Sequence, residues 1–121
     1  MVLILGALGA GKRAYAGSLG YADEQMSADP FSDAPVQTDL ERLLKNDPAC
    51  ADAIFEILLK KELVLCREVG SGVIPMNEED RAWREATGRL CCALAARASA
   101  VVRVVAGIPV ALKGDLPCVC D

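Results

Sequence analysis

The amino-acid sequence predicts an α/β fold in which helices cover both faces of a mainly parallel sheet. An apolar run over residues 2–5 comes directly before a glycine-rich segment and a helix-compatible stretch. Further apolar runs of strand length recur over residues 62–66 and 100–105, and segments of helical periodicity separate them. Strands that alternate with helices are typical of parallel sheets, because each parallel crossover needs a long connection.

The segment between the first two strong strands carries weaker signals. Residues 13–19 can open a helix directly after the glycine-rich segment. Residues 20–38 are predicted to be mainly loop because aspartate, serine and proline dominate them, although residues 35–39 also fit a short strand. Residues 40–44 return to helical spacing.

Capping signals predict two longer helices. Asp47 followed by Pro48 is typical of a helix N-terminus. The apolar stripe of that helix consists of Ala53, Ile54, Ile57, Leu58 and Lys61. Asn77 is predicted to cap the next helix, and acidic residues 78–80 suit its first turn. One face of that helix carries Trp83, Ala86, Leu90, Leu94 and Ala98. A turn at residues 107–109 then leads to a short partner strand over residues 110–112 and a tail over residues 114–121.

Length and composition indicate one globular domain over residues 1–121 with an aliphatic core, since 53% of residues are hydrophobic and only 4% aromatic. A net charge of −4 without a long basic run argues against a nucleic-acid partner. No apolar stretch reaches the roughly 20 residues of a membrane span, and the N-terminal run lacks a signal peptide's basic leader. Six scattered cysteines, with no histidine and no Cys-x-x-Cys pair, argue against a metal site and indicate a reducing cytoplasm.

Residues 6–12 read Gly-Ala-Leu-Gly-Ala-Gly-Lys, which is the Gly-x-x-x-x-Gly-Lys pattern of a phosphate-binding P-loop. Between a strand and a helix, such a loop can turn successive backbone N–H groups toward a phosphate while the lysine reaches the terminal phosphates. The motif predicts a P-loop NTPase-like three-layer fold. The residues expected to hold ATP or GTP are Gly6, Ala7, Leu8, Gly9, Ala10, Gly11, Lys12 and Arg13.

Arg13 departs from this pattern, because a serine or threonine hydroxyl normally follows the lysine and binds Mg²⁺. A guanidinium can only donate hydrogen bonds, whereas Mg²⁺ requires oxygen ligands, so the sequence argues against Mg²⁺. Two interpretations stay open. The glycines are kept only for close strand–helix packing, or the loop binds phosphate with Arg13 as a direct contact.

Asp39 and Glu68 are the candidates for a catalytic carboxylate at a neighbouring strand end, beside the catalytic Lys12. Asp39 follows a weak strand and is equally suited to cap the helix that begins at residue 40. Glu68 follows a convincing strand. It would either orient metal-bound water or the acceptor hydroxyl, or accept N–H bonds from the glycines after it.

A basic pair and an aromatic residue lie on the helix of residues 78–98. Arg81 and Arg84, one turn apart, either bind phosphate or pair with Glu78 and Glu85, which is the more common arrangement. Trp83 fits a core or oligomer contact better than a base-stacking platform.

Three segments carry a family resemblance. Residues 68–75 read Glu-Val-Gly-Ser-Gly-Val-Ile-Pro, residues 81–90 read Arg-Ala-Trp-Arg-Glu-Ala-Thr-Gly-Arg-Leu, and residues 104–113 read Val-Val-Ala-Gly-Ile-Pro-Val-Ala-Leu-Lys. In order and spacing they resemble the adenosylcobinamide kinase/adenosylcobinamide-phosphate guanylyltransferase family of cobalamin biosynthesis. The resemblance implies phosphoryl transfer from ATP or GTP to a corrinoid hydroxyl, and assembly as a homo-oligomer.

The chain also departs from that family. Arg67 replaces an asparagine, Cys91 and Cys92 replace an Asn-Gln pair, and Ala10 and Arg13 replace hydroxyl residues of the loop. The family's guanylylated histidine has no counterpart, since this chain contains no histidine, so guanylyl transfer through a histidine intermediate cannot run on its residues. Two functions stay open: a kinase-like nucleotide-binding protein, or a degenerate, non-catalytic relative acting as a binding or structural subunit.

Overall fold

A single sheet forms the frame of the protein. The computed structural model describes residues 1–68 and 77–117, and within them six strands pair in the order β2-β3-β4-β1-β5-β6. The strands are β1 (Val2–Gly6), β2 (Met26–Ser27), β3 (Val36–Gln37), β4 (Leu63–Arg67), β5 (Ala100–Val105) and β6 (Ile108–Lys113). The helices are α1 (Lys12–Ser18), α2 (Leu40–Asn46), α3 (Ala51–Leu59) and α4 (Glu78–Arg97), with short 3₁₀ turns η1 (Asp23–Gln25) and η2 (Pro48–Cys50).

Strand β1 occupies the middle of the sheet and runs parallel to both of its neighbours. Val2 is opposite Leu63 of β4 and Ala100 of β5, and β3 and β2 continue the parallel order. Only β6, which returns from β5 through a tight turn, is antiparallel within the described residues. Because the carboxyl ends of parallel strands meet at one edge, the segments that follow β1, β3 and β4 converge there.

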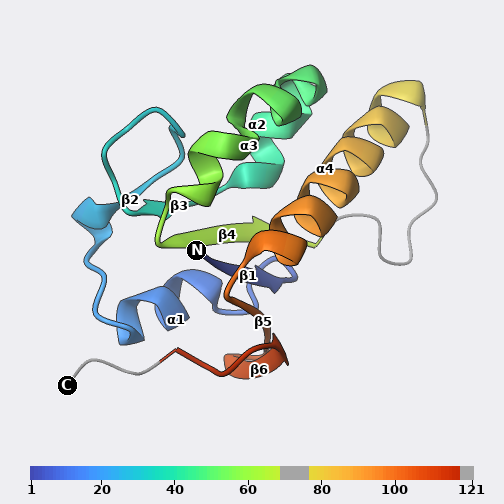
Figure 1. The fold of residues 1–121 in the computed structure, drawn as a ribbon. Coiled ribbons are helices and arrows are strands. Elements are labelled where there is room, and N and C mark those ends of the chain that lie inside the picture. The colour runs from blue at the N-terminus through green and yellow to red at the C-terminus, as the bar shows by residue number, and fades with distance from the viewer. Residues whose placement is uncertain (69–76, 118–121) are drawn as a thin grey trace.

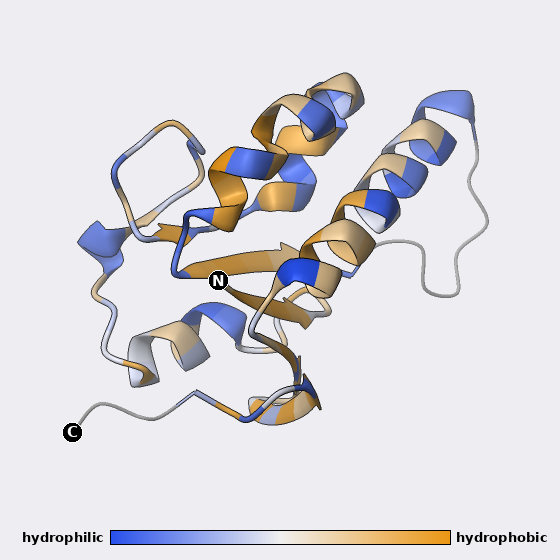
Figure 2. Cartoon of the chain, in the orientation of Figure 1, coloured by the Kyte–Doolittle hydropathy of each residue, from blue (hydrophilic) through white to orange (hydrophobic). Residues whose placement is uncertain are grey.

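Helices cover both faces of this sheet, with α1 on one side and α2, α3 and α4 on the other (Figure 1). Alternate residues of β1 divide between two cores: Leu3 packs in the cluster under α2–α4, and Ile4 packs in the cluster under α1. Figure 2 shows the central strands in the hydrophobic colour and blue turns on the outer sides of the helices. The predicted α/β three-layer fold with a mainly parallel sheet is therefore confirmed.

The predicted loop over residues 20–38 is wrong in part, because this segment contains η1 and the short strand β2. Strand β3 confirms the short strand predicted over residues 35–39. Met26 lies opposite Val36, and Ser27 opposite Gln37. A two-residue strand has no periodicity of its own. Its extended backbone is stabilised here by pairing with β3, which in turn pairs with β4.

The predicted apolar stripe of α3 needs correction. The helix begins at Ala51, after η2. Asp47 precedes η2, and its side chain makes no capping hydrogen bond there. Ala53 is exposed, while Ile54 and Leu58 are buried. Lys61 lies beyond the end of the helix, where its buried ammonium donates to the carbonyl oxygens of Ser32 (2.7 Å) and Ala34 (2.8 Å). These hydrogen bonds offset the cost of burying the Lys61 ammonium. The sequence pattern had placed Lys61 on the apolar stripe of the helix instead.

Helix α4 begins as predicted, with Asn77 Oδ1 accepting the N–H of Asp80 at 2.8 Å. Its ion pairs differ from the prediction: Glu85 pairs with Arg89 at 3.6 Å, and neither Arg81 nor Arg84 forms an ion pair within the described residues. The i, i+4 spacing favours the observed pair. Across residues 1–68 and 77–117, no helix combines the length and apolarity needed to cross a membrane.

Candidate functional site

The glycine loop between β1 and α1 is shaped by its backbone. Gly9 has a φ of 74° and Gly11 a φ of 98°, in the left-handed region that favours glycine. A β-carbon on Gly6 would lie 2.8 Å from the carbonyl oxygen of Val104, so β5 packs too closely for a side chain there. The N–H of Gly107 donates to Ala10 O at 2.8 Å, which ties the loop to the β5–β6 turn.

Lys12 folds back over this loop. Its ammonium donates to the carbonyl oxygens of Gly6 (3.1 Å) and Ala7 (2.9 Å). No hydrogen bond among the described residues uses the backbone N–H of Gly9, Gly11 or Lys12. The loop therefore presents a cation and unused N–H donors at the same edge of the sheet, which is the donor set that a phosphate accepts.

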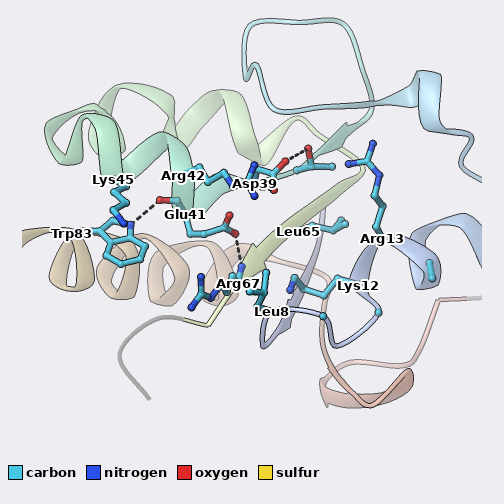
Figure 3. A pocket seen from close by; sticks show the side chains of 14 residues that line it. Leu8, Lys12, Arg13, Asp39, Glu41, Arg42, Lys45, Leu65, Arg67 and Trp83 are labelled. Atoms are coloured by element: carbon cyan, nitrogen blue, oxygen red, sulfur yellow. Dashed lines mark hydrogen bonds and ion pairs between the residues drawn. The ribbon is translucent and has the colours of Figure 1, made fainter. Parts of the chain in front are cut away.

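A pocket of about 500 Å³ opens in front of the loop, between it and α2 (Figure 3). Cationic side chains outnumber acidic ones in its lining, with Lys12, Arg13, Arg42, Lys45 and Arg67 against Asp39 and Glu41. The local charge thus favours an anionic ligand although the chain as a whole carries a net charge of −4.

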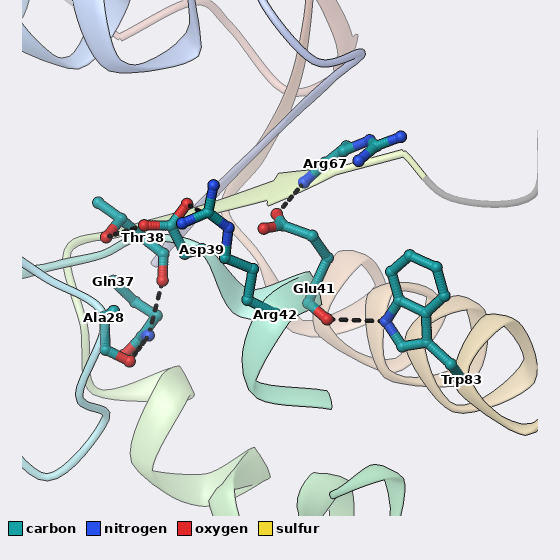
Figure 4. A network of polar contacts seen from close by, with 8 residues as sticks. All are labelled: Ala28, Gln37, Thr38, Asp39, Glu41, Arg42, Arg67 and Trp83. Carbon is teal, nitrogen blue, oxygen red and sulfur yellow. Dashed lines mark hydrogen bonds and ion pairs between the residues drawn. The ribbon is translucent and has the colours of Figure 1, made fainter. Parts of the chain in front are cut away.

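Asp39 lies in this pocket with Lys12, as the parallel topology requires. It precedes α2 with a left-handed backbone (φ 51°, ψ 36°), a conformation that aspartate tolerates better than most residues. Its carboxylate does not cap the helix. Instead it accepts from Thr38 Oγ1 at 3.4 Å, and Arg42 Nε lies 4.0 Å away (Figure 4). The structure therefore places this candidate acid in the lining of the loop pocket.

Glu68 is placed elsewhere. Its N–H donates to Gly6 O at 2.9 Å, but its carboxylate binds Arg103 through Nε (2.9 Å) and Nη2 (3.2 Å). It lines a separate cavity of about 330 Å³ next to α4 and does not line the loop pocket. The predicted bonds from the glycines that follow it lie outside the described residues. Its catalytic role stays a prediction.

Sequence reasoning did not identify Glu41 and Lys45 as the far wall of the pocket; Trp83 packs against the core as predicted and also lines this wall. Glu41 is buried, and its Oε1 accepts the N–H of Arg67 at 2.7 Å. The carbonyl oxygen of Glu41 accepts Trp83 Nε1–H at 2.7 Å, and the Lys45 ammonium lies 5.0 Å from the centre of the Trp83 ring (Figure 4). The available signal was positional: α2 follows the end of β3 after two intervening residues, at the edge of a parallel sheet where ligands commonly bind.

Replacing Trp83 with phenylalanine keeps an aromatic ring but removes its hydrogen bond to Glu41. We expect the free energy of unfolding to fall by about 1–2 kcal/mol. Urea unfolding followed by circular dichroism measures this, since Trp83 is the only tryptophan and its fluorescence is lost. Lys45→Met is the control, because it removes only the cation over the ring and should cost about 0.5 kcal/mol. A loss in Trp83→Phe no larger than the about 0.5 kcal/mol expected for Lys45→Met would show that the indole hydrogen bond contributes little.

Among the side chains beside the loop, Thr38 and Asp39 carry oxygen atoms, but Arg13, which follows Lys12, carries none. Arg13 offers only donors, is more than half exposed, and lies 3.7 Å from Asp23 Oδ1. Asp39 supplies oxygen ligands, but Arg42 stands next to it. No group of three or more histidine, cysteine, aspartate or glutamate side chains is placed to hold a metal ion in the described part of the chain.

Comparison with known proteins places most of the chain in one protein family. Residues 33–112 match the family model described as cobinamide kinase / cobinamide phosphate guanyltransferase. Over 80 residues the chain is 35% identical to the bifunctional adenosylcobalamin biosynthesis protein CobP of Pseudomonas aeruginosa. The alignment covers 60% of this chain and 46% of that relative, so the chain spans about half the length of the curated protein it matches. The matched range includes Asp39, Glu41 and Trp83, and the glycine loop precedes it.

Proposed function

Because the chain belongs to the cobinamide kinase / cobinamide phosphate guanyltransferase family, we propose that it binds ATP or GTP at residues 6–13 and transfers the terminal phosphoryl group to a corrinoid hydroxyl. The observation that carries the proposal is the position of Lys12. Its ammonium sits on the carbonyl oxygens of Gly6 and Ala7 at the mouth of a cationic pocket. Phosphate oxygens would replace these carbonyls as acceptors of its hydrogen bonds.

In this proposal the chain acts by holding and neutralising the phosphates. The N–H groups of Gly9, Gly11 and Lys12 donate to phosphate oxygens, and the Arg13 guanidinium takes part of the charge that a metal would otherwise neutralise. Asp39 lines the same pocket and is the carboxylate placed to accept the proton of the acceptor hydroxyl. Phosphoryl transfer depends mainly on such positioning and charge stabilisation.

A second candidate is a non-catalytic nucleotide-binding or structural subunit. Two observations favour it: Arg13 stands where a Mg²⁺ ligand is usual, and the Glu68 carboxylate is paired with Arg103 and does not line the loop pocket. Guanylyl transfer through a histidine intermediate has no residue in this chain to run on. Homo-oligomeric assembly is part of both candidates, and edge strand β6 offers exposed apolar side chains for it at Ile108, Val110 and Leu112.

The Arg13→Ser variant tests how the loop neutralises phosphate. We expect the wild type to bind ATP or GTP with nearly the same affinity with and without Mg²⁺, and the variant to gain an increase of about tenfold or more on adding Mg²⁺. Titration calorimetry with each nucleotide, with and without Mg²⁺, measures both. Arg89→Ser is the matched control, because this exposed arginine pairs with Glu85 on α4, outside the loop pocket.

The outcomes separate the candidates. Tight, strictly Mg²⁺-dependent binding by the wild type would contradict the role given to Arg13. Absence of binding to any nucleotide would overturn the proposal as a whole. Nucleotide binding without phosphorylation of cobinamide, followed by mass spectrometry, would leave the non-catalytic candidate in place.

A further inference from the structure

Two cysteine thiols meet where β4 packs against α4. Cys66 Sγ and Cys91 Sγ lie 3.7 Å apart, close enough for a hydrogen bond between sulfur atoms. Cys66 is fully buried in the core under α2–α4, and Cys91 is partly exposed. Cys91 also lines the cavity of about 330 Å³ that holds Glu68 and Arg103, whereas Cys66 is not among the residues that line it.

We propose that Cys66 and Cys91 are a modification site: a dithiol pair that a peroxide oxidises to a reversible disulfide. The pair joins positions 25 residues apart in the chain, and its members come from different elements. A disulfide requires the sulfurs to approach to about 2 Å, a movement of roughly 1.7 Å that side-chain rotation and a small shift of α4 can provide. This inference does not depend on nucleotide binding.

The chemistry assigns the two sulfurs different roles. The Cys91 thiolate attacks one oxygen of hydrogen peroxide and breaks the O–O bond. It becomes a sulfenic acid, and hydroxide leaves and takes up a proton to form water. The Cys66 sulfur, losing its proton, then attacks Cys91 Sγ and breaks the S–O bond. The second hydroxide leaves with that proton as water. Two thiols are oxidised by two electrons, and one peroxide is reduced to two waters.

The surroundings favour this order. Cys91 Sγ donates to Cys66 Sγ in the structure. A Cys91 thiolate has no proton to donate, so once Cys91 ionises the hydrogen bond can come only from Cys66. Donation from Cys66 lowers the pKa of Cys91, against opposing effects of burial and of the Glu41 and Glu68 carboxylates. The same hydrogen bond, together with burial, raises the pKa of Cys66 well above its ordinary value. The less buried residue of the pair is thus also the one with the lower thiol pKa.

Oxidation would fasten α4 to β4 beside the loop pocket. Cys66 directly precedes Arg67, whose N–H binds Glu41, and α4 also carries Trp83, which binds the carbonyl of Glu41. The disulfide would therefore join two elements that both support the far wall of that pocket.

Peptide mapping of the full chain tests the proposal. The folded protein is treated with hydrogen peroxide, remaining thiols are alkylated in denaturant, and trypsin releases residues 62–67, with Cys66, and 90–97, with Cys91 and Cys92. Cys92 is the matched control, since it is adjacent in sequence but exposed. We expect the 62–67/90–97 link in the wild type and in Cys92→Ser, at least about tenfold less of it in Cys91→Ser, and its loss with dithiothreitol.

Other results would overturn the proposal. These are alkylation of both Cys66 and Cys91 after peroxide treatment, a link that persists in Cys91→Ser, or oxidation of Cys91 to sulfinic acid without a link. A misfolded Cys91→Ser variant could lose the link for an unrelated reason, so wild-type protein is also oxidised in denaturant. Without the fold, Cys66 should no longer link to Cys91 in preference to the other cysteines. If the same selectivity survived in denaturant, the folded structure would not be its cause.

Discussion

Replacing Lys12 with alanine is expected to weaken binding of ATP or GTP by about 10–100-fold. The ammonium of Lys12 lies directly on the glycine loop, where it donates to Gly6 O and Ala7 O. A charge-assisted hydrogen bond to phosphate contributes more than a neutral one, and the loop N–H groups alone do not replace the lost charge. Titration calorimetry measures the change directly.

Lys60→Ala is the matched control, because Lys60 is exposed and does not line the pocket of the glycine loop. It lines a different cavity, next to residues 30–35 between β2 and β3. It removes the same charge from the chain and should leave the affinity nearly unchanged. A similar loss in both variants would mean that the overall charge, and not the loop, governs binding. Unchanged affinity in Lys12→Ala would remove the basis of the proposed nucleotide site.

Replacing Leu94 with alanine is expected to lower the free energy of unfolding by about 3–5 kcal/mol. Leu94 is completely buried in the core between α4 and the sheet, where it packs in one cluster with Leu3, Leu44 and Val101. The substitution removes apolar contact and leaves a cavity that the sheet cannot collapse to fill. A loss of this size is a large share of the stability of an ordinary domain. Urea unfolding followed by circular dichroism measures it.

Leu112→Ala makes the same chemical change on the edge strand β6, where the side chain is 57% exposed. Its expected cost is within about 0.5 kcal/mol. If the two variants lost similar stability, either Leu94 would not be central to the core or Leu112 would be covered by a further copy of the chain. Measuring Leu112→Ala at several protein concentrations separates these explanations, because only assembly depends on concentration.

The most local signals gave the most reliable predictions. The apolar runs over residues 2–5, 62–66 and 100–105 became the three central strands, because a strand buried on both faces needs an uninterrupted run of aliphatic residues. Asn77 caps α4 as predicted, since its side chain satisfies an N–H only three residues away. Such features depend on neighbours in the sequence.

Predictions failed where distant segments decide the structure. Strand β2 exists because β3 lies beside it, and Lys61 is buried because the carbonyls of Ser32 and Ala34 surround its ammonium. The predicted ion pairs of Arg81 and Arg84 are not formed within the described residues, where Glu85 pairs with Arg89. None of these choices can be read from local periodicity.

The sequence by itself determined the three-layer α/β fold, the family and the glycine loop with Lys12, because aliphatic runs, glycine spacing and motif order are properties of the chain. Only the tertiary structure decided what faces that loop. It brought Asp39, Glu41 and Trp83 to one pocket, paired Glu68 with Arg103, and set Cys66 against Cys91. The physical reason is that parallel strand order and helix packing bring residues tens of positions apart within hydrogen-bonding distance, and a linear pattern does not record which of them meet.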